Sequence, residues 1–411
     1  MIISMAFRNV FRHKKRTVLT MLTVIFGIFA GIMGDGLNSG MKWQVADIYT
    51  KTLTSSYNVY GSGFFNEEEK NDPIEYLFDE KSGEELLKNQ KGVIAYSKRI
   101  LIDGTVTNGI EEMKTRFIGV YPDNENSVFD RKSSIISGVF TGKNSGEKIV
   151  VGSELAKILN LKKGDTVTIM ARTANKAVNA YDVEIEGLIR TGNPIVDNSY
   201  IFMRIDFAKS FADTDKINDI AVKRENLSIN KIKKEMEEIN RNSKKKNLTF
   251  VSWYKETEDL MELIKFRWKI FSVITFVILL MAAAGITNTM LMAMLERKKE
   301  IGIMMANGMS AGKIAALFTI EGAFIGVLGS SIAFIAGFLV VTHFAKVGIS
   351  IPMASGGFGS DFPINDKLYL YFDLVHALIF YVIGIVVATL SALYPARKAV
   401  KLEPVEAIRG N

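Results

Sequence analysis

The stretch LERKKEIGIMMANG, residues 295–308, separates two long apolar runs. Residues 270–295 before it contain no Asp, Glu, Lys or Arg, and residues 314–343 after it contain only one such residue, Glu321. A charged break this short has no room for a folded domain. It therefore predicts a tight connection between two membrane helices, lying on one side of a bilayer.

Four apolar runs in the chain are each long enough to cross a membrane, because about 20 helical residues span a hydrocarbon core of ~30 Å. The sequence predicts a membrane protein with four transmembrane α-helices and a large extracytoplasmic α+β domain between the first two. The predicted segments are a cytoplasmic amphipathic helix (1–16), a first span (17–40), the extracytoplasmic domain with stalk helices (41–268), a second span (269–295), a cytoplasmic connection (296–313), a third span (314–343), an extracytoplasmic loop (344–371), a fourth span (372–395) and a cytoplasmic tail (396–411).

The N-terminal segment has apolar residues at helical spacing, with basic residues between and after them. This pattern predicts an amphipathic helix on the membrane surface, its cations against anionic lipid. The alternative is the basic start of a cleaved signal peptide, but the apolar run 17–34 is long for one and no clear A-x-A site follows. The residues that carry the pattern are Ile3, Phe7, Val10 and Phe11, with Arg8, Arg12 and residues 14–16.

Basic residues also set the orientation. They cluster at both ends of the chain and in the 296–313 connection. The positive-inside rule predicts that this side is cytoplasmic, in a bacterial inner membrane, and that the domain lies outside. The formal charge of +7 therefore indicates membrane topology and not nucleic-acid binding. The cations are Arg8, Arg12, residues 14–16, residues 297–299, Lys313, Arg397, Lys398 and Lys401.

The extracytoplasmic region shows no catalytic constellation. The chain has no Cys, and its three His (His13, His343 and His376) all lie outside residues 41–268, which excludes a Ser-His-Asp hydrolase there. We interpret its scattered carboxylates, Glu125 among them, as solvated surface groups. The expected strands are 57–60, 93–102, 115–121, 149–151, 166–170, 183–189, 200–203 and 217–222; the expected helices are 154–159, capped by Ser153, 229–240 and 253–268.

Small residues recur within the spans. Gly27 and Gly31, and again Gly322 and Gly326, stand four apart, a spacing that lets a second helix approach closely. Glu321 lies about two turns inside the third span, and we expect it to be a structural tether to a cation; a role in transport is the alternative. Within residues 287–289, hydroxyl or amide groups either bond across the bundle or back-bond to their own helix.

Several motifs together resemble the MacB/FtsX superfamily of ABC transporter permeases. They are FRNVFRHKKR at 7–16, ERKKEIGI at 296–303 with Ala306 and Gly308, YPARKA at 394–399 and EPVEAIR at 403–409. Within the domain, IGVYP at 118–122 and GSELA at 152–156, followed by KGD at 163–165, are most similar to the lipoprotein-releasing LolC/LolE branch. The resemblance implies a type VII ABC permease-like fold.

The resemblance also implies a function. The chain has no G-x-x-x-x-G-K-[ST] phosphate loop, so it would bind no cofactor, and ATP and Mg would sit on a separate ATPase. The implied partners are that ATPase, a second permease chain, membrane lipid, a lipoprotein or other periplasmic substrate, and a periplasmic carrier or adaptor. Export of a peptide or antibiotic in the manner of MacB, and regulation of a cell-wall hydrolase in the manner of FtsX, remain alternatives. The residues expected to face acyl chains are Met33, Met281 and Met290.

On this resemblance, we interpret the stretch at residues 295–308 as a coupling helix that docks on the ATPase. We expect residues 296–300 to extend the second span, residues 301–306 to supply an apolar ridge, and Gly308 to end the helix. A solvated turn with snorkelling side chains is the alternative; it suits residues 297–299 but not the apolar residues after them. The predicted ATPase-coupling residues are Glu296, Arg297, Glu300, Ile301, Gly302, Ile303, Met304, Ala306 and Gly308.

Overall fold

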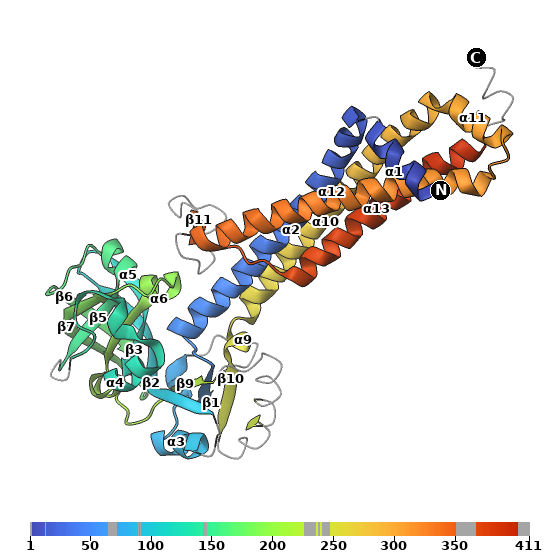
Figure 1. Ribbon diagram of the computed structural model, residues 1–411. Helices are drawn as coiled ribbons and strands as arrows, with labels where there is room; N and C mark the ends of the chain where they lie inside the picture. The colour runs from blue at the N-terminus through green and yellow to red at the C-terminus, as the bar shows by residue number, and fades with distance from the viewer. Residues whose placement is uncertain are drawn as a thin grey trace. The chain divides into compact units, whose positions relative to one another are not determined.

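A computed structural model describes residues 2–12, 14–64, 72–88, 90, 92–142, 146–225, 236, 239–240, 247–350 and 367–401 (Figure 1). The chain forms two compact units. One, the membrane unit, comprises the described residues of Met1–Trp43, Glu262–Ser350 and Lys367–Asn411. The other, the extracytoplasmic unit, comprises those of Gln44–Met261.

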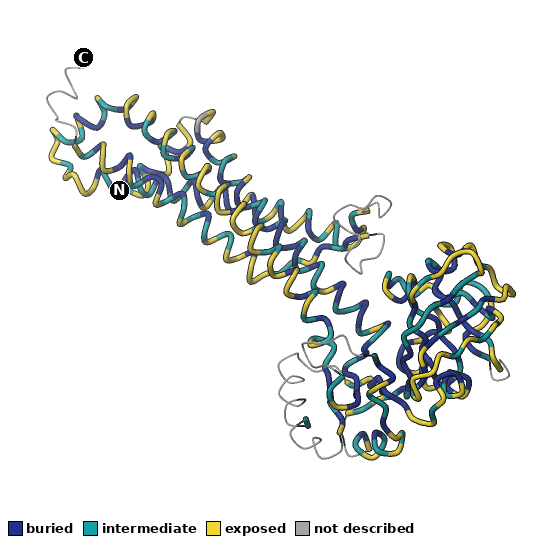
Figure 2. The backbone as a smooth tube through the Cα atoms, turned by 180° about the vertical axis from the view of Figure 1, so that it is seen from behind, coloured by how far each residue is buried: buried dark blue, intermediate teal, exposed yellow. Residues whose placement is uncertain are grey.

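Four long apolar helices dominate the membrane unit, and each is long and apolar enough to cross a bilayer. Figure 2 shows buried and exposed residues alternating along them, as expected of helices with one face in a bundle. The helices are α2 (Lys14–Thr52), α10 (Glu258–Glu296), α12 (Ala311–Val347) and α13 (Leu374–Val400), with the short helices α1 (Ile2–Arg12) and α11 (Lys298–Ala306) and the strand pair β11 (Ile349–Ser350) and β12 (Lys367–Leu368).

Two of these helices are longer than a span requires. The first span continues without a break to Thr52 as one 39-residue helix, α2, and α10 is also 39 residues long. At 1.5 Å per residue each measures about 58 Å, roughly twice the hydrocarbon core. The predicted stalk helix 253–268 is nearly continuous: α9 (Trp253–Glu256) meets α10 at Thr257, whose N–H still donates to the Trp253 carbonyl.

The glycines of the spans lie at close helix contacts. A Cβ on Gly27 would lie 3.2 Å from Leu279 of α10, and one on Gly31 would lie 2.6 Å from Phe380 of α13. The glycines of α12 meet α13 in the same way: a Cβ on Gly322 or Gly326 would lie 2.4 or 2.8 Å from an alanine Cβ. Packing, which the spacing predicted, thus has identified partners.

The fourth span corrects the prediction at its end. Pro395 was expected to terminate it, yet α13 continues through Pro395 to Val400. Proline has no N–H to donate to the carbonyl four residues earlier, that of Ser391. The Thr287 hydroxyl of α10 donates to this carbonyl instead, at 3.1 Å, and so compensates the break. Thr289, by contrast, back-bonds to Gly285 of its own helix.

The extracytoplasmic unit is built on one ten-stranded mixed sheet of order β10-β1-β9-β2-β3-β8-β5-β7-β4, with β6 pairing with β2 and β7. The long strand β2 pairs with β3, β6 and β9 and so connects the parts of the sheet. The strands are β1 (Tyr57–Gly61), β2 (Val93–Thr107), β3 (Glu112–Val120), β4 (Ile135–Gly138), β5 (Lys148–Gly152), β6 (Thr166–Arg172), β7 (Val178–Ile189), β8 (Tyr200–Arg204), β9 (Asp219–Arg224) and β10 (Leu248–Ser252).

Short helices pack on this sheet over a core of buried aliphatic and aromatic side chains. One local prediction fails here, and another falls outside the described residues. Ser153 does not cap its helix, because Gly152 occupies the N-cap position and the Ser153 hydroxyl has no partner in the described structure. The predicted helix 229–240 and residues 244–246 lie largely outside the described residues. The helices are η1 (Pro73–Glu75), α3 (Glu80–Lys88), α4 (Pro122–Phe129), η2 (Arg131–Ser134), α5 (Ser153–Ile158), α6 (Pro194–Ser199) and α7 (Ile205–Ala212).

One carboxylate prediction is also wrong. Glu125 was interpreted as a surface group, but it is fully buried and accepts hydrogen bonds from two arginines, Arg99 and Arg131. Asp103 agrees better with the expectation of surface exposure, since it remains part-exposed in a bidentate pair with Arg116. Periodicity could not reveal Glu125, because a helix of eight residues gives too short a pattern to show which face is buried.

Candidate coupling site

The connection between the second and third spans is a separate short helix, α11. The prediction that residues 296–300 extend the second span is wrong. The helix α10 ends at Glu296, and the chain breaks at Arg297, whose φ of −102° and ψ of 18° are not helical. At the other end Gly308 has φ +84°, its N–H donates to the Met305 carbonyl, and Met309 N–H donates to that of Met304. This pair of bonds is the Schellman motif, so Gly308 ends the helix as expected.

The two faces of α11 differ in exposure. Ile301 is 0% exposed and Gly302 is buried, and Ile301 lies in the apolar core of the membrane unit. Ile303 is 52% exposed, and Lys299 and Ala306 are also exposed. The positions 299, 303 and 306 follow helical spacing and share one face. This outward face is therefore narrower than the predicted ridge of residues 301–306, since Gly302 is buried and Ile301, Met304 and Met305 pack into the core.

Arg297 anchors the connection to the third span. Its guanidinium donates to both Glu321 oxygens, at 3.1 and 3.4 Å, and lies 5.7 Å from the centroid of the Phe318 ring. Both side chains of the pair are more than nine-tenths buried. Glu321 is thus held by a cation in this structure, and Arg297 is not the solvated side chain of the alternative interpretation.

Glu300 joins the connection to the N-terminal helix. Its carboxylate accepts from Arg297 at 3.1 Å and from Arg12 of α1 at 2.9 Å. Partial burial opposes ionisation of Glu300, but the two neighbouring guanidinium groups outweigh it and lower its pKa. Glu300 therefore carries its charge at neutral pH. Because Arg12 is largely exposed, salt will screen this outer pair.

The helix α1 completes the cluster. Asn9 donates to the Glu321 carboxylate at 2.6 Å, while Ala6 and Val10 are buried. Phe7 is half-exposed and its ring lies 5.6 Å from that of Phe324 on α12. We call Asn9, Arg12, Arg297, Glu300 and Glu321 the coupling cluster. Sequence reasoning missed Asn9 and Arg12 as site residues; their spacing of three on one helix was the available signal.

The predicted methionine positions do not line the apolar groove of this unit. A groove of about 430 Å³ lies between α10 and α13, with Trp268, Phe276 and Phe380 among its lining residues. Met281 is instead 70% exposed, Met290 is buried in the bundle core, and Met33 packs against that core. An acyl chain would therefore meet mainly aromatic and branched side chains in this groove.

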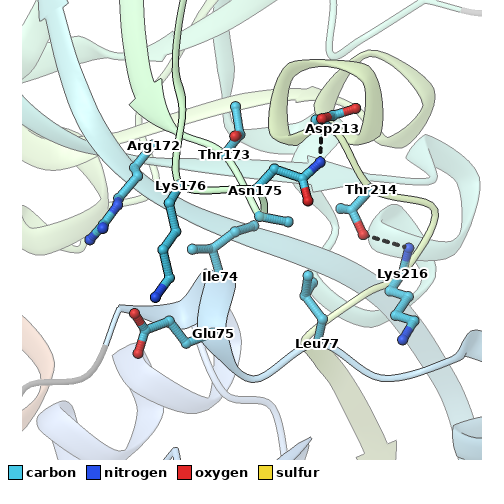
Figure 3. A pocket seen from close by; sticks show the side chains of 11 residues that line it. Ile74, Glu75, Leu77, Arg172, Thr173, Asn175, Lys176, Asp213, Thr214 and Lys216 are labelled. Carbon is cyan, nitrogen blue, oxygen red and sulfur yellow. Dashed lines mark hydrogen bonds between the residues drawn. The ribbon is translucent and has the colours of Figure 1, made fainter.

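The extracytoplasmic unit also has a polar pocket of about 590 Å³ (Figure 3). Two hydrogen bonds join residues of its lining: the Asn175 amide donates to the Asp213 carboxylate at 2.6 Å, and the backbone N–H of Lys216 donates to the Thr214 hydroxyl at 3.2 Å. No His lines it. Among the described residues, no group of three or more His, Cys, Asp or Glu is placed to hold a metal ion.

These features define the class: a four-span membrane protein with a large β/α domain inserted after its first span. Residues 272–404 match the family model "FtsX-like permease C-terminal", and residues 17–239 match "MacB-like periplasmic core domain". The chain therefore belongs to the MacB/FtsX superfamily of ABC transporter permeases. The fold and family expected from the sequence are confirmed.

Relatives agree with this assignment. An ABC transporter permease of Methanocaldococcus jannaschii is 27% identical, covering 100% of this chain and 98% of its own length. The lipoprotein-releasing system transmembrane protein LolC of Neisseria meningitidis is 23% identical over 78% of this chain and 79% of its own length. The macrolide export ATP-binding/permease protein MacB of Haemophilus ducreyi is 24% identical, over 98% of this chain but 55% of MacB.

Among solved structures, the periplasmic region of MacB from Actinobacillus actinomycetemcomitans matches with a TM-score of 0.35 and 12% identity. The match covers 52% of this chain and 96% of that one. The extracellular domain of the transporter YknZ matches with a TM-score of 0.33 and 16% identity, over 48% of this chain and 99% of that one.

Proposed function

We propose that this permease passes ATPase-driven motion through the membrane to its extracytoplasmic domain, and that the motion extracts a lipoprotein from the inner membrane for transfer to a periplasmic carrier. The observation that carries the proposal is the continuity of α2 and α10, each 39 residues long. A helix of about 58 Å exceeds a ~30 Å core, so it can move a domain outside when pushed from inside.

The motor in this proposal is a separate ATPase, which binds ATP and Mg, and a second permease chain completes the transporter. The exposed face of α11, with Lys299, Ile303 and Ala306, is the docking surface. The coupling cluster fixes that surface to α12 and α1. The positive-inside rule supports cytoplasmic termini, because cations cluster in residues 8–16, 297–299 and 397–401, next to the span ends that this orientation places in the cytoplasm.

Two findings support a lipoprotein as the load. The groove between α10 and α13 has an almost wholly apolar lining, as an acyl chain requires. LolC proteins, which by name belong to a lipoprotein-releasing system, align with most of this chain.

A second candidate is export of a peptide, an antibiotic or another periplasmic substrate in the manner of MacB. It is favoured by one specific observation: the MacB alignment extends over 98% of this chain, against 78% for LolC. An FtsX-like regulator of a cell-wall hydrolase has less support, because the match to the FtsX-like model is confined to residues 272–404.

The test uses the full chain, purified with its ATPase and reconstituted in liposomes that contain a triacylated lipoprotein. We expect ATP, but not a non-hydrolysable analogue, to release the lipoprotein to a soluble carrier. ATP hydrolysis without release would contradict the proposed load. Stimulation of the same preparation by a macrolide or peptide would then favour the second candidate.

A further inference from the structure

The outer end of α2 is held by two buried arginines of the extracytoplasmic unit. Arg131 donates to the Thr52 carbonyl at 2.6 Å, and Arg99 donates to the Leu53 carbonyl at 2.9 Å. Carbonyls at a helix C-terminus lack intrahelical partners and form the negative end of the helix dipole. Two guanidinium groups at this end therefore satisfy the carbonyls and attract the dipole.

A single carboxylate holds both arginines. Glu125 accepts from Arg99 at 2.9 and 3.0 Å and from Arg131 at 3.0 Å. All three side chains are at most 2% exposed. The Phe129 ring lies 4.2 Å from the Arg99 guanidinium and 4.6 Å from that of Arg131. Burial and shared bonds leave this cluster little freedom, so it can transmit force.

We call α2 the first stalk and α9 with α10 the second stalk. The end of the second stalk is held differently. At α9, Glu256 accepts from the Tyr60 hydroxyl at 3.2 Å, and the Trp253 N–H lies 3.5 Å from the Ser56 carbonyl. A cavity of about 140 Å³ lies between the stalk ends, lined by Tyr49 and Leu53 from the first and Glu256 from the second. The second end also continues directly from β10, which pairs with β1, so this stalk joins the sheet through the backbone itself.

We propose that Arg99, Glu125 and Arg131 form the joint by which movement of α2 is passed to the extracytoplasmic sheet. The inference rests on the proposed function, since a joint needs motion to carry. Arg99 lies on β2, the strand that pairs with β3, β6 and β9, so a displacement at Leu53 reaches the centre of the sheet. The three residues are positioning residues and contact no substrate.

The test measures two distances in the full-length complex in liposomes, before and after ATP. The chain has no Cys, so introduced thiols are its only labelling sites. One label pair, at W43C and V375C, measures the distance between α2 and α13. The other, at V178C and V375C, measures the distance between the extracytoplasmic unit and α13. All three positions are exposed.

The variant is R99M/E125Q/R131M, which removes all three members of the joint and leaves none of them as an unpaired buried charge. We expect ATP to shift both distances in the wild type, but only the α2 pair in the variant. R131K, which keeps the charge, should retain part of the shift in the extracytoplasmic pair. K98M is the matched control, because it breaks the Lys98–Glu80 and Lys98–Glu84 pairs of the same strand, β2, and leaves Arg99, Glu125 and Arg131 in place, and it should behave as wild type.

An undiminished shift of the extracytoplasmic pair in a folded R99M/E125Q/R131M variant would overturn the joint. So would an equal loss in K98M, which would indicate a general defect of the sheet. If ATP moves neither pair in the wild type, the proposed function fails and the joint fails with it. The α2 pair therefore distinguishes the two failures.

Discussion

At the scale of single residues, burial separates two ion pairs of the coupling cluster. Arg297 and Glu321 are 8% and 7% exposed, whereas Arg12 and Glu300 are 61% and 43% exposed. Breaking a buried pair costs about 3–5 kcal/mol, while an exposed pair contributes about 0–1 kcal/mol. The Arg297–Glu321 pair therefore anchors the connection, and the Arg12–Glu300 pair contributes little to its stability.

This difference predicts unequal effects of substitution. Glu321→Gln should lower the free energy of unfolding by about 3 kcal/mol, because the buried Arg297 then keeps only the part-exposed Glu300 as a charged partner. Arg12→Ala should lower it by less than 1 kcal/mol. Denaturation of the detergent-solubilised chain measures both. The double variant Arg297→Met/Glu321→Leu should recover much of the loss; equal losses in the two single variants would contradict the assignment.

A second residue-scale prediction concerns pH. Burial raises the pKa of Asp219 to about 7; Arg99 opposes the shift and Glu125 adds to it. The folded domain therefore holds more protons than the unfolded chain between pH ~4 and ~7. Stability from this group is greatest below pH 4 and falls as pH rises to 7, by up to about 1.4 kcal/mol per pH unit. Glu256, whose pKa burial also raises, contributes with the same sign.

Thermal unfolding of the full chain between pH 5 and pH 8 tests this sign. Asp219→Asn should flatten the decline in stability, since the amide cannot ionise. Asp215→Asn, at an exposed position, should leave the decline as in the wild type. A wild-type chain whose stability rises over this range in step with Asp219 ionisation would contradict the prediction.

At the scale of elements, close packing of helices decides which glycines matter. A Cβ on Gly34 of α2 would lie 1.6 Å from the Phe271 ring of α10, whereas one on Gly312 of α12 would meet nothing within 4 Å. Gly34→Ala should therefore destabilise the membrane unit by about 1–3 kcal/mol, because the ring must move. Gly312→Ala should be neutral or slightly stabilising, since alanine favours helix.

The readout for this pair is the midpoint of denaturation in detergent. Both substitutions add one methyl group to a helical glycine, so their difference isolates the contact with Phe271. Equal midpoints for the two variants would show that α2 and α10 are not packed this closely.

At the scale of the whole molecule, the proposed function depends on the exposed face of α11, where an ATPase would dock. Ile303→Asp should weaken ATPase binding by tenfold or more, because a buried aliphatic anchor in an interface is worth about 2 kcal/mol. Since Ile303 is half-exposed here, the fold should survive. Co-purification of the ATPase measures the effect. Ile110→Asp, at a 92% exposed position of the extracytoplasmic unit, is the control and should bind normally.

The sequence predicted the spans and strands better than the contacts between side chains. The four spans and most strands were correct, because hydropathy and alternation repeat over many residues. The burial of Ile301, the break at Arg297 and the partnership of Asn9 with Glu321 were not predicted. Each depends on which helix lies beside another, and a short segment such as α11 carries no periodic signal for its neighbours.

By itself, then, the sequence determined the membrane class, the order of spans and domain, and the helix end at Gly308, because chain-local properties set all three. Only the tertiary structure decided that Arg297 and Glu321 form a buried pair. It also decided that Arg99 and Arg131, both bonded to Glu125, donate to the carbonyls at the end of α2. Arg99 lies 26 residues from Glu125 in the chain, and Arg297 lies 24 residues from Glu321. They meet because a charge taken out of water needs an opposite charge beside it, and only folding brings one there.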